Sequence, residues 1–326
     1  RKRFVDDLSA RFPTEDKGAL HWILNTRITR DRSARKLEIS QELYVADLLQ
    51  KYSELVDSST TRVFDSPMEE GLIFHFDDEI IPGGDSYESF APQRAIYMSL
   101  VGAYQWLANM TRPDIAYASS QLARHLTRPG PKHLRAAVRV LLYLKHTASR
   151  CLTYAPHEAR PFEVFVDSSW GPHFSISGTM FFMYGCLFHW FSKSQRSVAL
   201  SSAEAEFFGA MLAARDVIFV RELLFDLLRV PQEGPTIMYT DSAIDMSFDP
   251  TSFKKTKHIL RASHFLRDLV VKDVVRLVHL PGTSMIADIL TKAVARALFL
   301  QLLALLAEYS ESGVAHLLRA ESREPS

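Results

Sequence analysis

The chain has 326 residues, of which 47% are hydrophobic, and its 38 basic residues balance its 38 acidic residues. This composition is typical of a globular protein of about two domains and excludes a globally basic surface, so nucleic acid could bind only through local patches. Its 2 cysteines cannot form a disulfide framework, and its longest nearly apolar stretch is far shorter than the roughly 20 residues of a membrane-spanning helix.

These features predict a protein without a membrane segment that is located inside the cell and is not secreted. The chain begins at Arg1 and has neither an initiator methionine nor the apolar core of a signal peptide. We therefore expect it to be a segment of a longer polypeptide.

The N-terminal part of the chain predicts a mixed α and β unit. Residues 3–13 have helical spacing, and residues 19–31 and 36–41 have the composition of two strands around a turn. Residues 40–53 form an amphipathic pattern with Ser40 as the expected helix cap.

An irregular segment and three helices follow. Residues 66–92 are acidic, contain Pro and Gly and show no periodicity, which indicates a linker or a surface excursion. Helical patterns cover residues 94–111, 114–127 and 131–149, with Pro131 in a first turn, where proline is tolerated.

From about residue 161 the pattern changes to short strands. Strand-like runs cover residues 162–167, 178–184, 186–193, 236–241 and 274–280. The second and third of these runs are expected to join in a hairpin turn at Tyr184 and Gly185. Helical runs cover residues 202–230 and 256–272, and a last helix is expected around Asp288. Three antiparallel strands followed by alternating helices and strands predict a mixed sheet with helices packed on it.

Four carboxylates stand where these elements end or begin, namely Asp167, Glu206, Asp241 and Asp288. Singly, each is explained by a turn, a helix cap or a charge at a helix N-terminus. Together at element junctions they favour a site for two divalent ions about 3.5 to 4 Å apart, the arrangement that stabilises the attacking and leaving oxygens of phosphodiester hydrolysis. The sequence therefore predicts a metal-dependent nuclease.

Either Glu204 or Glu206 could be the glutamate of this set of metal ligands. Ser201 and Glu204 fit the S-x-x-E capping box, which gives Glu204 a local role at the helix start. Residues two apart on a helix do not face the same point, so only one of the two glutamates can reach the metals. Glu206 is the predicted ligand.

Six blocks in order resemble the C-terminal part of the Pol polyprotein of copia-type LTR retrotransposons, which ends in a ribonuclease H domain. These blocks are residues 99–118, 133–147, 166–170, 198–207, 256–265 and 287–292. The resemblance implies an enzyme that cleaves the RNA strand of RNA/DNA hybrids, with two Mg²⁺ or Mn²⁺ ions held by Asp167, Glu206, Asp241 and Asp288. It also implies that the rest of the reverse transcriptase and Pol polyprotein is a partner.

The fold implied by the resemblance is α/β: a ribonuclease H-like mixed five-stranded sheet flanked by helices, preceded by an α+β reverse-transcriptase remnant and a helical connection. The implied domains are the remnant of the palm or thumb (1–65), a linker (66–92), the connection (93–160), the ribonuclease H-like domain (161–300), and a C-terminal helix and tail (301–326).

Residues 4–7, FVDD, are open to a second interpretation, because reverse transcriptases of this family carry a YVDD-like turn that binds the polymerase metals. Such a turn needs an apolar strand on each side, whereas basic or aromatic residues precede Val5 and an amphipathic stretch follows Asp7. The helical interpretation is favoured, and no polymerase activity is expected from this chain alone.

Several polar residues are candidates for nucleic-acid binding. Residues 251–276 carry seven basic and two acidic residues, a net charge of +5, which fits either a solvated helix face or phosphate contacts. Ser201 and Ser202 could reach 2′-hydroxyls, although capping is their simpler use. The candidates are Lys193, Arg196, Ser201, Ser202, Lys254, Lys255 and Lys257.

Two departures from the family bear on activity. Ser169 stands where the family usually has an acidic residue, and the loop after it is shorter than usual. The alternative hypothesis is therefore a catalytically inactive fragment that binds nucleic acid or protein. A third hypothesis is a related carboxylate nuclease or an integrase-type strand transferase, since the same sheet can carry both chemistries.

Overall fold

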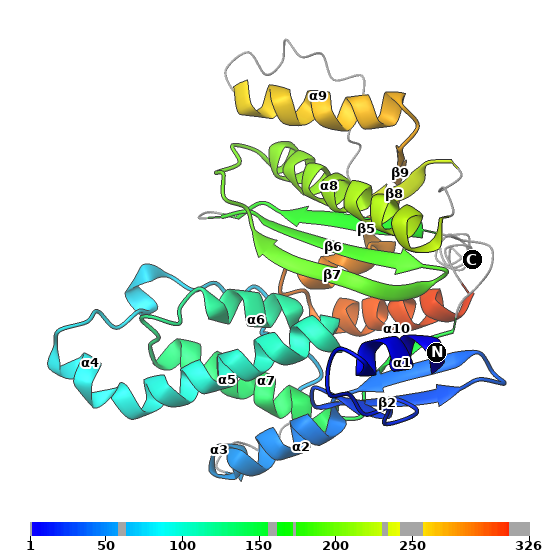
Figure 1. Cartoon of the computed structure of the whole chain (residues 1–326). Helices are drawn as coiled ribbons and strands as arrows, with labels where there is room; N and C mark the ends of the chain where they lie inside the picture. The colour runs from blue at the N-terminus through cyan, green and yellow to red at the C-terminus, as the bar shows by residue number, and fades with distance from the viewer. Residues whose placement is uncertain are drawn as a thin grey trace, which may run out of the picture.

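The computed structural model of the chain describes residues 2–57, 63–155, 162–171, 174–229, 234–241 and 257–312. This part of the chain forms two sheets and a set of helices that pack between and around them (Figure 1). None of its helices has the length and the apolar character needed to cross a membrane.

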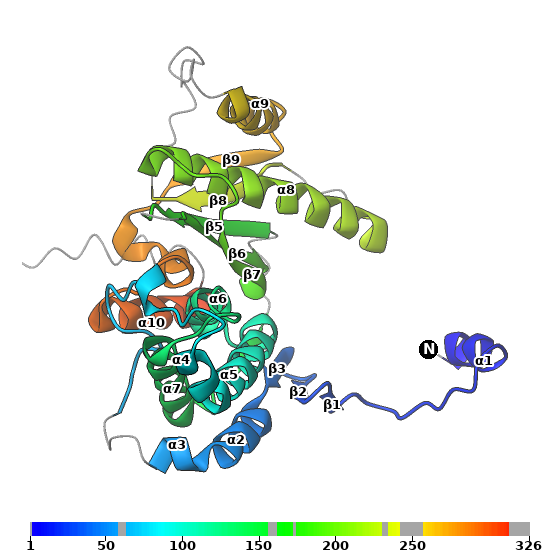
Figure 2. The same ribbon diagram turned by 90° about the vertical axis from the view of Figure 1, so that its left-hand side faces the viewer.

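The first sheet is antiparallel with the order β1-β2-β3-β4. Its elements, after helix α1 (Lys2–Ser9), are β1 (Trp22–Ile23), β2 (Thr26–Asp31), β3 (Lys36–Ser40) and the distant β4 (Leu152–Tyr154). The single strand predicted over 19–31 is wrong. Leu24 and Asn25 have φ of 48° and 57°, so they form a tight two-residue turn that splits the run into a hairpin. Residues 4–7 lie in α1, which projects away from the body of the chain (Figure 2).

A helical block follows this sheet. Its elements are α2 (Glu42–Lys51), α3 (Ser53–Asp57), η1 (Phe76–Asp78), α4 (Asp85–Ser89), α5 (Ala91–Met110), η2 (Pro113–Ile115), α6 (Ala116–Ala123) and α7 (Pro131–His146). Two buried tyrosines connect α5 to the helices α6 and α7. Tyr97 donates a hydrogen bond to Leu122 O at 2.6 Å, and Tyr104 donates one to Ala137 O at 2.8 Å.

The predicted cap of α2 is displaced by one residue. Gln41 occupies the N-cap position without a side-chain hydrogen bond, while the Ser40 hydroxyl accepts a bond from the backbone N–H of Glu42 at 3.2 Å. Ser40, the residue before the N-cap, therefore satisfies a backbone donor of the first turn.

The second sheet has five strands in the order β7-β6-β5-β8-β9. Its strands are β5 (Phe162–Ser169), β6 (Ile176–Met183), β7 (Cys186–Ser194), β8 (Thr236–Thr240) and β9 (Val275–His279). The first three pair antiparallel, and β8 and β9 join β5 in parallel. The hairpin predicted at Tyr184 and Gly185 is present, with φ of 50° and 79°. The predicted fold class, a ribonuclease H-like mixed five-stranded sheet flanked by helices, is confirmed.

Helices cover both faces of this sheet (Figure 1). Val164 and Val166 pack with α8 (Ser202–Leu228) and α9 (Lys257–Val271) on one face. Phe165 packs on the other face, in the same core as α10 (Arg296–Ser312), the 3-10 turn η5 (Ile286–Leu290) and the helical block. The short turn η4 (Gly282–Ser284) leads into η5.

One hydrogen bond links the helical block directly to the edge of the sheet. Trp190 of β7 is buried and donates from Nε1 to Ala108 O in α5 at 2.7 Å. The helical block and this face of the sheet therefore share one continuous hydrophobic core, and the block supports the sheet that carries Asp167.

Candidate metal centre

Asp167 is placed by the side-chain alternation of the central strand β5. Because side chains alternate across a strand, Glu163, Phe165 and Asp167 all point to the face that η5 and α10 cover. Tyr309 of α10 donates a hydrogen bond to Glu163, and Thr291 after η5 donates one to Asp167 Oδ2. Asp167 is only 1% exposed.

Two glycines allow the neighbouring elements to approach this strand. Gly178 of β6 pairs with Asp167, and a Cβ at this position would meet Leu290 Cβ and Thr291 Cγ2 at 2.6 Å each. A Cβ at Gly209 of α8 would lie 2.1 Å from Ser168 Oγ. Both approaches leave no room for a side chain, so η5 and α8 lie directly against the sheet.

Asp288 lies in η5, which is a five-residue 3-10 turn and not the α-helix expected there. Its side chain is buried and faces the end of β5, since Asp288 joins Asp167 in one group of close carboxylates. Asp241 directly follows the last residue of β8, the parallel neighbour of β5. One carboxylate oxygen from each of Asp167, Asp241 and Asp288 lies within 4.8 Å of the others.

The two glutamates of α8 have the different surroundings that the capping pattern predicts. Ser201 accepts a hydrogen bond from the backbone N–H of Glu204 at 3.2 Å, and Glu204 Oε2 accepts one from the backbone N–H of Leu200 at 2.7 Å. Glu204 is thus held at the helix start. Glu206, at 9% exposure, instead lies within electrostatic reach of Asp167 and Asp241.

The crowding of acids changes their proton affinity. Burial, and then the charges of Asp167 and Asp241, raise the pKa of Glu206 to about 9. Burial, and then the charge of Asp167, raise the pKa of Asp288 to about 8, and the same two causes raise the pKa of Asp241. Such shifts are expected where carboxylates share a site from which water is largely excluded.

The oxygens of this cluster fit a divalent cation with oxygen ligands. Asp167 Oδ1 and Glu206 Oε2 are buried and accept no hydrogen bond within the part of the chain that the structure describes. Buried acceptors without donors are costly, and a bound Mg²⁺ or Mn²⁺ ion would satisfy them and offset the repulsion between carboxylates.

Sequence reasoning missed one member of the site, Lys292. Its Nζ lies 3.0 Å from Asp288 Oδ1 and 3.8 Å from Asp167 Oδ2. Burial lowers the pKa of this lysine, but the charges of Asp167 and Asp288 outweigh burial and raise it. The i,i+4 spacing of Asp288 and Lys292 was the available signal, and it is also common on exposed helices.

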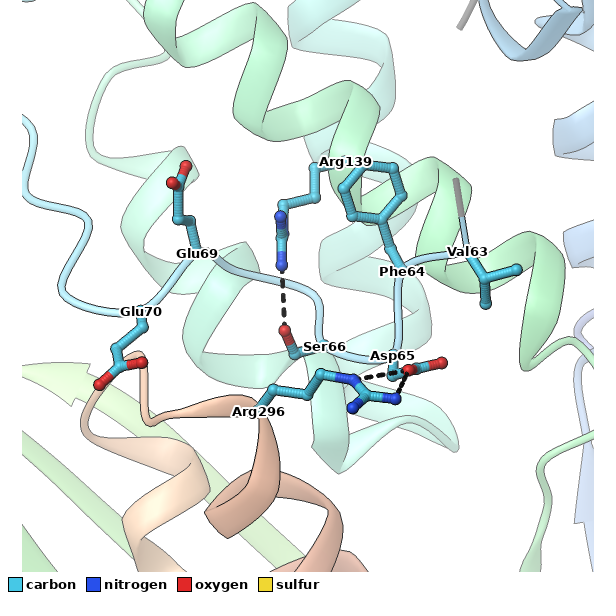
Figure 3. Close-up of a pocket in the computed structure, with 8 residues that line it drawn as sticks. All are labelled: Val63, Phe64, Asp65, Ser66, Glu69, Glu70, Arg139 and Arg296. Carbon is cyan, nitrogen blue, oxygen red and sulfur yellow. Dashed lines mark hydrogen bonds and ion pairs between the residues drawn. The ribbon is translucent and has the colours of Figure 1, made fainter. Parts of the chain in front are cut away.

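The segment that carries Asp288 and Lys292 is tied to the loop around residue 65 (Figure 3). Arg296 Nε donates to Asp65 Oδ2 at 2.7 Å, and the backbone N–H of Gly71 donates to Ala293 O at 3.2 Å. Gly71 lies in the predicted linker, residues 66–92, and Asp65 is the last residue of the predicted unit before it. In the fold this loop holds the backbone next to the carboxylates.

Four of the nucleic-acid candidates lie near the start of α8. Lys193 is near the end of β7, with Nζ 4.4 Å from the centre of the Phe191 ring, and Arg196 is exposed in the next loop. The Ser201 hydroxyl caps α8, whereas Ser202 is exposed at its first position.

The other candidates come from the basic stretch. Lys254 and Lys255 lie outside the described residues, as does the side chain of Lys257, the first residue of α9. Farther along, Lys272 and Arg276 pair with aspartates at 2.7 and 3.4 Å, so part of the positive charge is balanced locally.

Comparison with known proteins finds related sequences. No family model matches the chain. The Retrovirus-related Pol polyprotein from transposon TNT 1-94 of Nicotiana tabacum is 29% identical over 297 residues, which is 90% of this chain and 22% of the relative. The corresponding polyprotein from transposon RE1 of Arabidopsis thaliana is 29% identical over 303 residues, 90% of this chain and 19% of the relative.

Among solved structures, the N-terminal ribonuclease H domain of a Mycobacterium tuberculosis protein, fused to maltose-binding protein, aligns with a TM-score of 0.29 and 12% identity. The alignment covers 41% of this chain and 91% of that chain. The fold class follows from the strand order above and not from this alignment. The resemblance seen in the sequence is confirmed: the relatives that match about 90% of this chain are copia-type, retrovirus-related Pol polyproteins, and the chain spans about a fifth of their length.

Proposed function

We propose that this chain is a ribonuclease H that cleaves the RNA strand of RNA/DNA hybrids with two bound divalent ions. The observation that carries the proposal is the meeting of Asp167, Asp241 and Asp288 within 4.8 Å, with Glu206 beside them, at the end of a ribonuclease H-like sheet. Similarity to Pol polyproteins of transposons supports the choice of nucleic acid as substrate.

The four carboxylates would hold Mg²⁺ or Mn²⁺. When bound, such ions supply a water of lowered pKa and positive charge at the attacking and leaving oxygens. The chain itself contributes the placement. Thr291 orients Asp167 through a hydrogen bond, and Gly178 and Gly209 let η5 and α8 bring Asp288 and Glu206 to the same strand. Rigid support of this kind keeps the ligands at productive positions.

The substrate would lie across the rim beside the start of α8. Lys193 and Arg196 would contact phosphates, and Ser202 would contact a 2′-hydroxyl; Lys254, Lys255 and Lys257 remain candidates for phosphate contacts from the sequence alone. We assign residues 1–65 to a remnant of the reverse transcriptase and expect the remainder of the Pol polyprotein to be the chain's partner.

The test is a panel of equal-length substrates: RNA/DNA hybrid, double-stranded RNA, double-stranded DNA and single-stranded RNA, each with Mg²⁺, Mn²⁺ or EDTA. The proposal predicts metal-dependent cuts in the RNA strand of the hybrid alone. Tight hybrid binding without metal-dependent cleavage would select the inactive binding fragment. A preference for ends of double-stranded DNA would select the strand transferase.

Replacing Glu204 and Glu206 by glutamine, one at a time, distinguishes the proposed metal ligand from the residue that caps α8. Glu206→Gln is expected to reduce hybrid cleavage at least about a hundredfold, because a metal ligand loses its charge. Glu204→Gln is expected to change the free energy of unfolding by less than about 1 kcal/mol and to retain most of the cleavage, because the glutamine oxygen can still accept the bond from Leu200. Initial cleavage rates and urea unfolding of both variants make the measurement, and equal losses of cleavage would contradict the assignment.

A further inference from the structure

The carboxylate cluster already contains a cation of its own. Within the described residues, Lys292 is the one basic side chain that forms ion pairs with the predicted ligands, at 3.0 Å from Asp288 and 3.8 Å from Asp167. These two aspartates belong to the close group that would bind the first metal ion. The ammonium and a divalent ion would therefore compete for the same oxygens.

We propose that Lys292 is the exchangeable counter-ion of this cluster: its ammonium holds the carboxylates before metal binds, and a divalent ion must displace it. The proposal rests on the metal site of the proposed function and does not depend on the cleavage reaction. Lys292 is in this sense a positioning residue, because it acts through Asp167 and Asp288.

Electrostatics makes the competition strong. Two unit charges a few ångströms apart interact strongly near a protein surface, where the effective dielectric constant is about 20. A divalent ion beside an ammonium at such a distance would experience twice that repulsion. The ammonium must therefore move away from the oxygens, or the affinity of the site for metal stays low.

The side chain of Lys292 can make this movement without a change of the backbone. It is 40% exposed, whereas Asp167 and Asp288 are 1% and 7% exposed. Its flexible four-carbon stem can carry the charge to solvent. The backbone on both sides is held by the Thr291 hydrogen bond to Asp167 and by the bond from Gly71 to Ala293.

The experiment measures Mn²⁺ affinity by calorimetry at pH 8 without nucleic acid, for the full chain and for Lys292→Met and Lys292→Arg. Lys292→Met is expected to bind Mn²⁺ at least about tenfold more tightly, because the competing charge is gone. Lys292→Arg should stay within about threefold of the parent chain, since it keeps the charge. Lys132→Met is the matched control, because Lys132 forms a similar ion pair with Asp78 at 2.8 Å away from the carboxylate cluster.

Thermal unfolding supplies the second measurement. Without metal, Lys292→Met should melt below the parent chain, because the carboxylates lose their counter-ion, and Mn²⁺ should raise its melting temperature by more than it raises that of the parent. Unchanged or weaker Mn²⁺ binding by Lys292→Met would overturn the proposal even if hybrid cleavage is found. Tighter binding in a chain that cleaves nothing would uphold it and refute only the proposed function.

Discussion

Asp167→Asn is expected to reduce metal-dependent hybrid cleavage by at least about a thousandfold, the largest effect on activity of any single change considered. Asp167 lies on the central strand, within 4.8 Å of both Asp241 and Asp288 through one oxygen of each, and is within electrostatic reach of Glu206. Asparagine keeps the size and the acceptor for Thr291 but removes the charge. The loss should therefore come from the metal site and not from the fold.

Initial rates on a labelled hybrid, with circular dichroism melts of the same samples, test this expectation. Asp226→Asn is the matched control, because Asp226 is an exposed residue near the end of α8 and the chemical change is the same. Cleavage by Asp167→Asn within tenfold of the parent chain, at equal folded content, would remove Asp167 from the mechanism.

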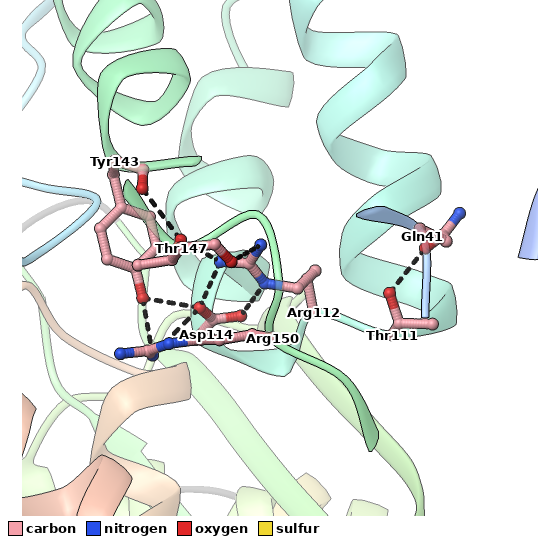
Figure 4. Close-up of polar contacts among 7 residues, drawn as sticks. All are labelled: Gln41, Thr111, Arg112, Asp114, Tyr143, Thr147 and Arg150. Carbon is pink, nitrogen blue, oxygen red and sulfur yellow. Dashed lines mark hydrogen bonds and ion pairs between the residues drawn. The ribbon is translucent and has the colours of Figure 1, made fainter. Parts of the chain in front are cut away.

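Asp114→Asn is expected to lower the free energy of unfolding by about 3–5 kcal/mol, because it leaves a buried guanidinium without its counter-charge. Arg112 and Asp114 are 2% and 4% exposed and are joined by two hydrogen bonds, from Nε at 2.9 Å and from a terminal nitrogen at 2.8 Å (Figure 4). Tyr143 donates a third bond to the same carboxylate at 2.6 Å.

Urea unfolding of the parent chain and of Asp114→Asn measures this loss. Asp78→Asn is the control, since Asp78 pairs with Lys132 at 2.8 Å at a partly exposed site, and such pairs contribute about 0–1 kcal/mol. A loss below about 1 kcal/mol for Asp114→Asn would mean that the buried pair adds nothing to stability.

The same pair predicts a dependence of stability on pH. Burial alone would raise the pKa of Asp114, but the charge and the hydrogen bonds of Arg112 outweigh burial and lower it. A carboxyl group with a lowered folded pKa stabilises the fold above its unfolded value of about 3.9, and this contribution is lost as the pH falls below that value. As the pH is lowered through that value, the free energy of unfolding of Asp114→Asn should therefore fall less than that of the parent chain.

This network also concerns the metal centre, because the helical block supports the segment that carries the ligands. Asp114 and Lys292 line one small pocket together with Ile289 of η5. Disruption of the Arg112–Asp114 pair should thus loosen the packing beneath η5, although neither residue belongs to the carboxylate cluster.

Local features of the sequence predicted much of the second sheet and of the site. The apolar run of residues 162–167 predicted β5 and placed Asp167 close to its end, although the strand continues to Ser169. The turn at Tyr184 and Gly185 was also predicted, and the capping box separated Glu204 from Glu206. These predictions succeeded because they depend on neighbours within a few residues.

The features that were missed depend on contacts between distant segments. β4 has three residues and exists because it pairs with β3, more than 100 residues earlier. The place of Lys292 follows from the docking of η5 against Gly178, which no short pattern encodes. The ion pair of Asp65, at the predicted start of the linker, was missed because its partner, Arg296, lies near the other end of the chain.

The most direct measurement is anomalous X-ray scattering from crystals of the chain grown or soaked with Mn²⁺. Mn²⁺ peaks are expected in contact with carboxylate oxygens of Asp167, Glu206, Asp241 and Asp288. The ammonium of Lys292 is expected to lie away from Asp288. Crystals at saturating Mn²⁺ that show no anomalous density among these four carboxylate side chains would contradict the proposed metal site.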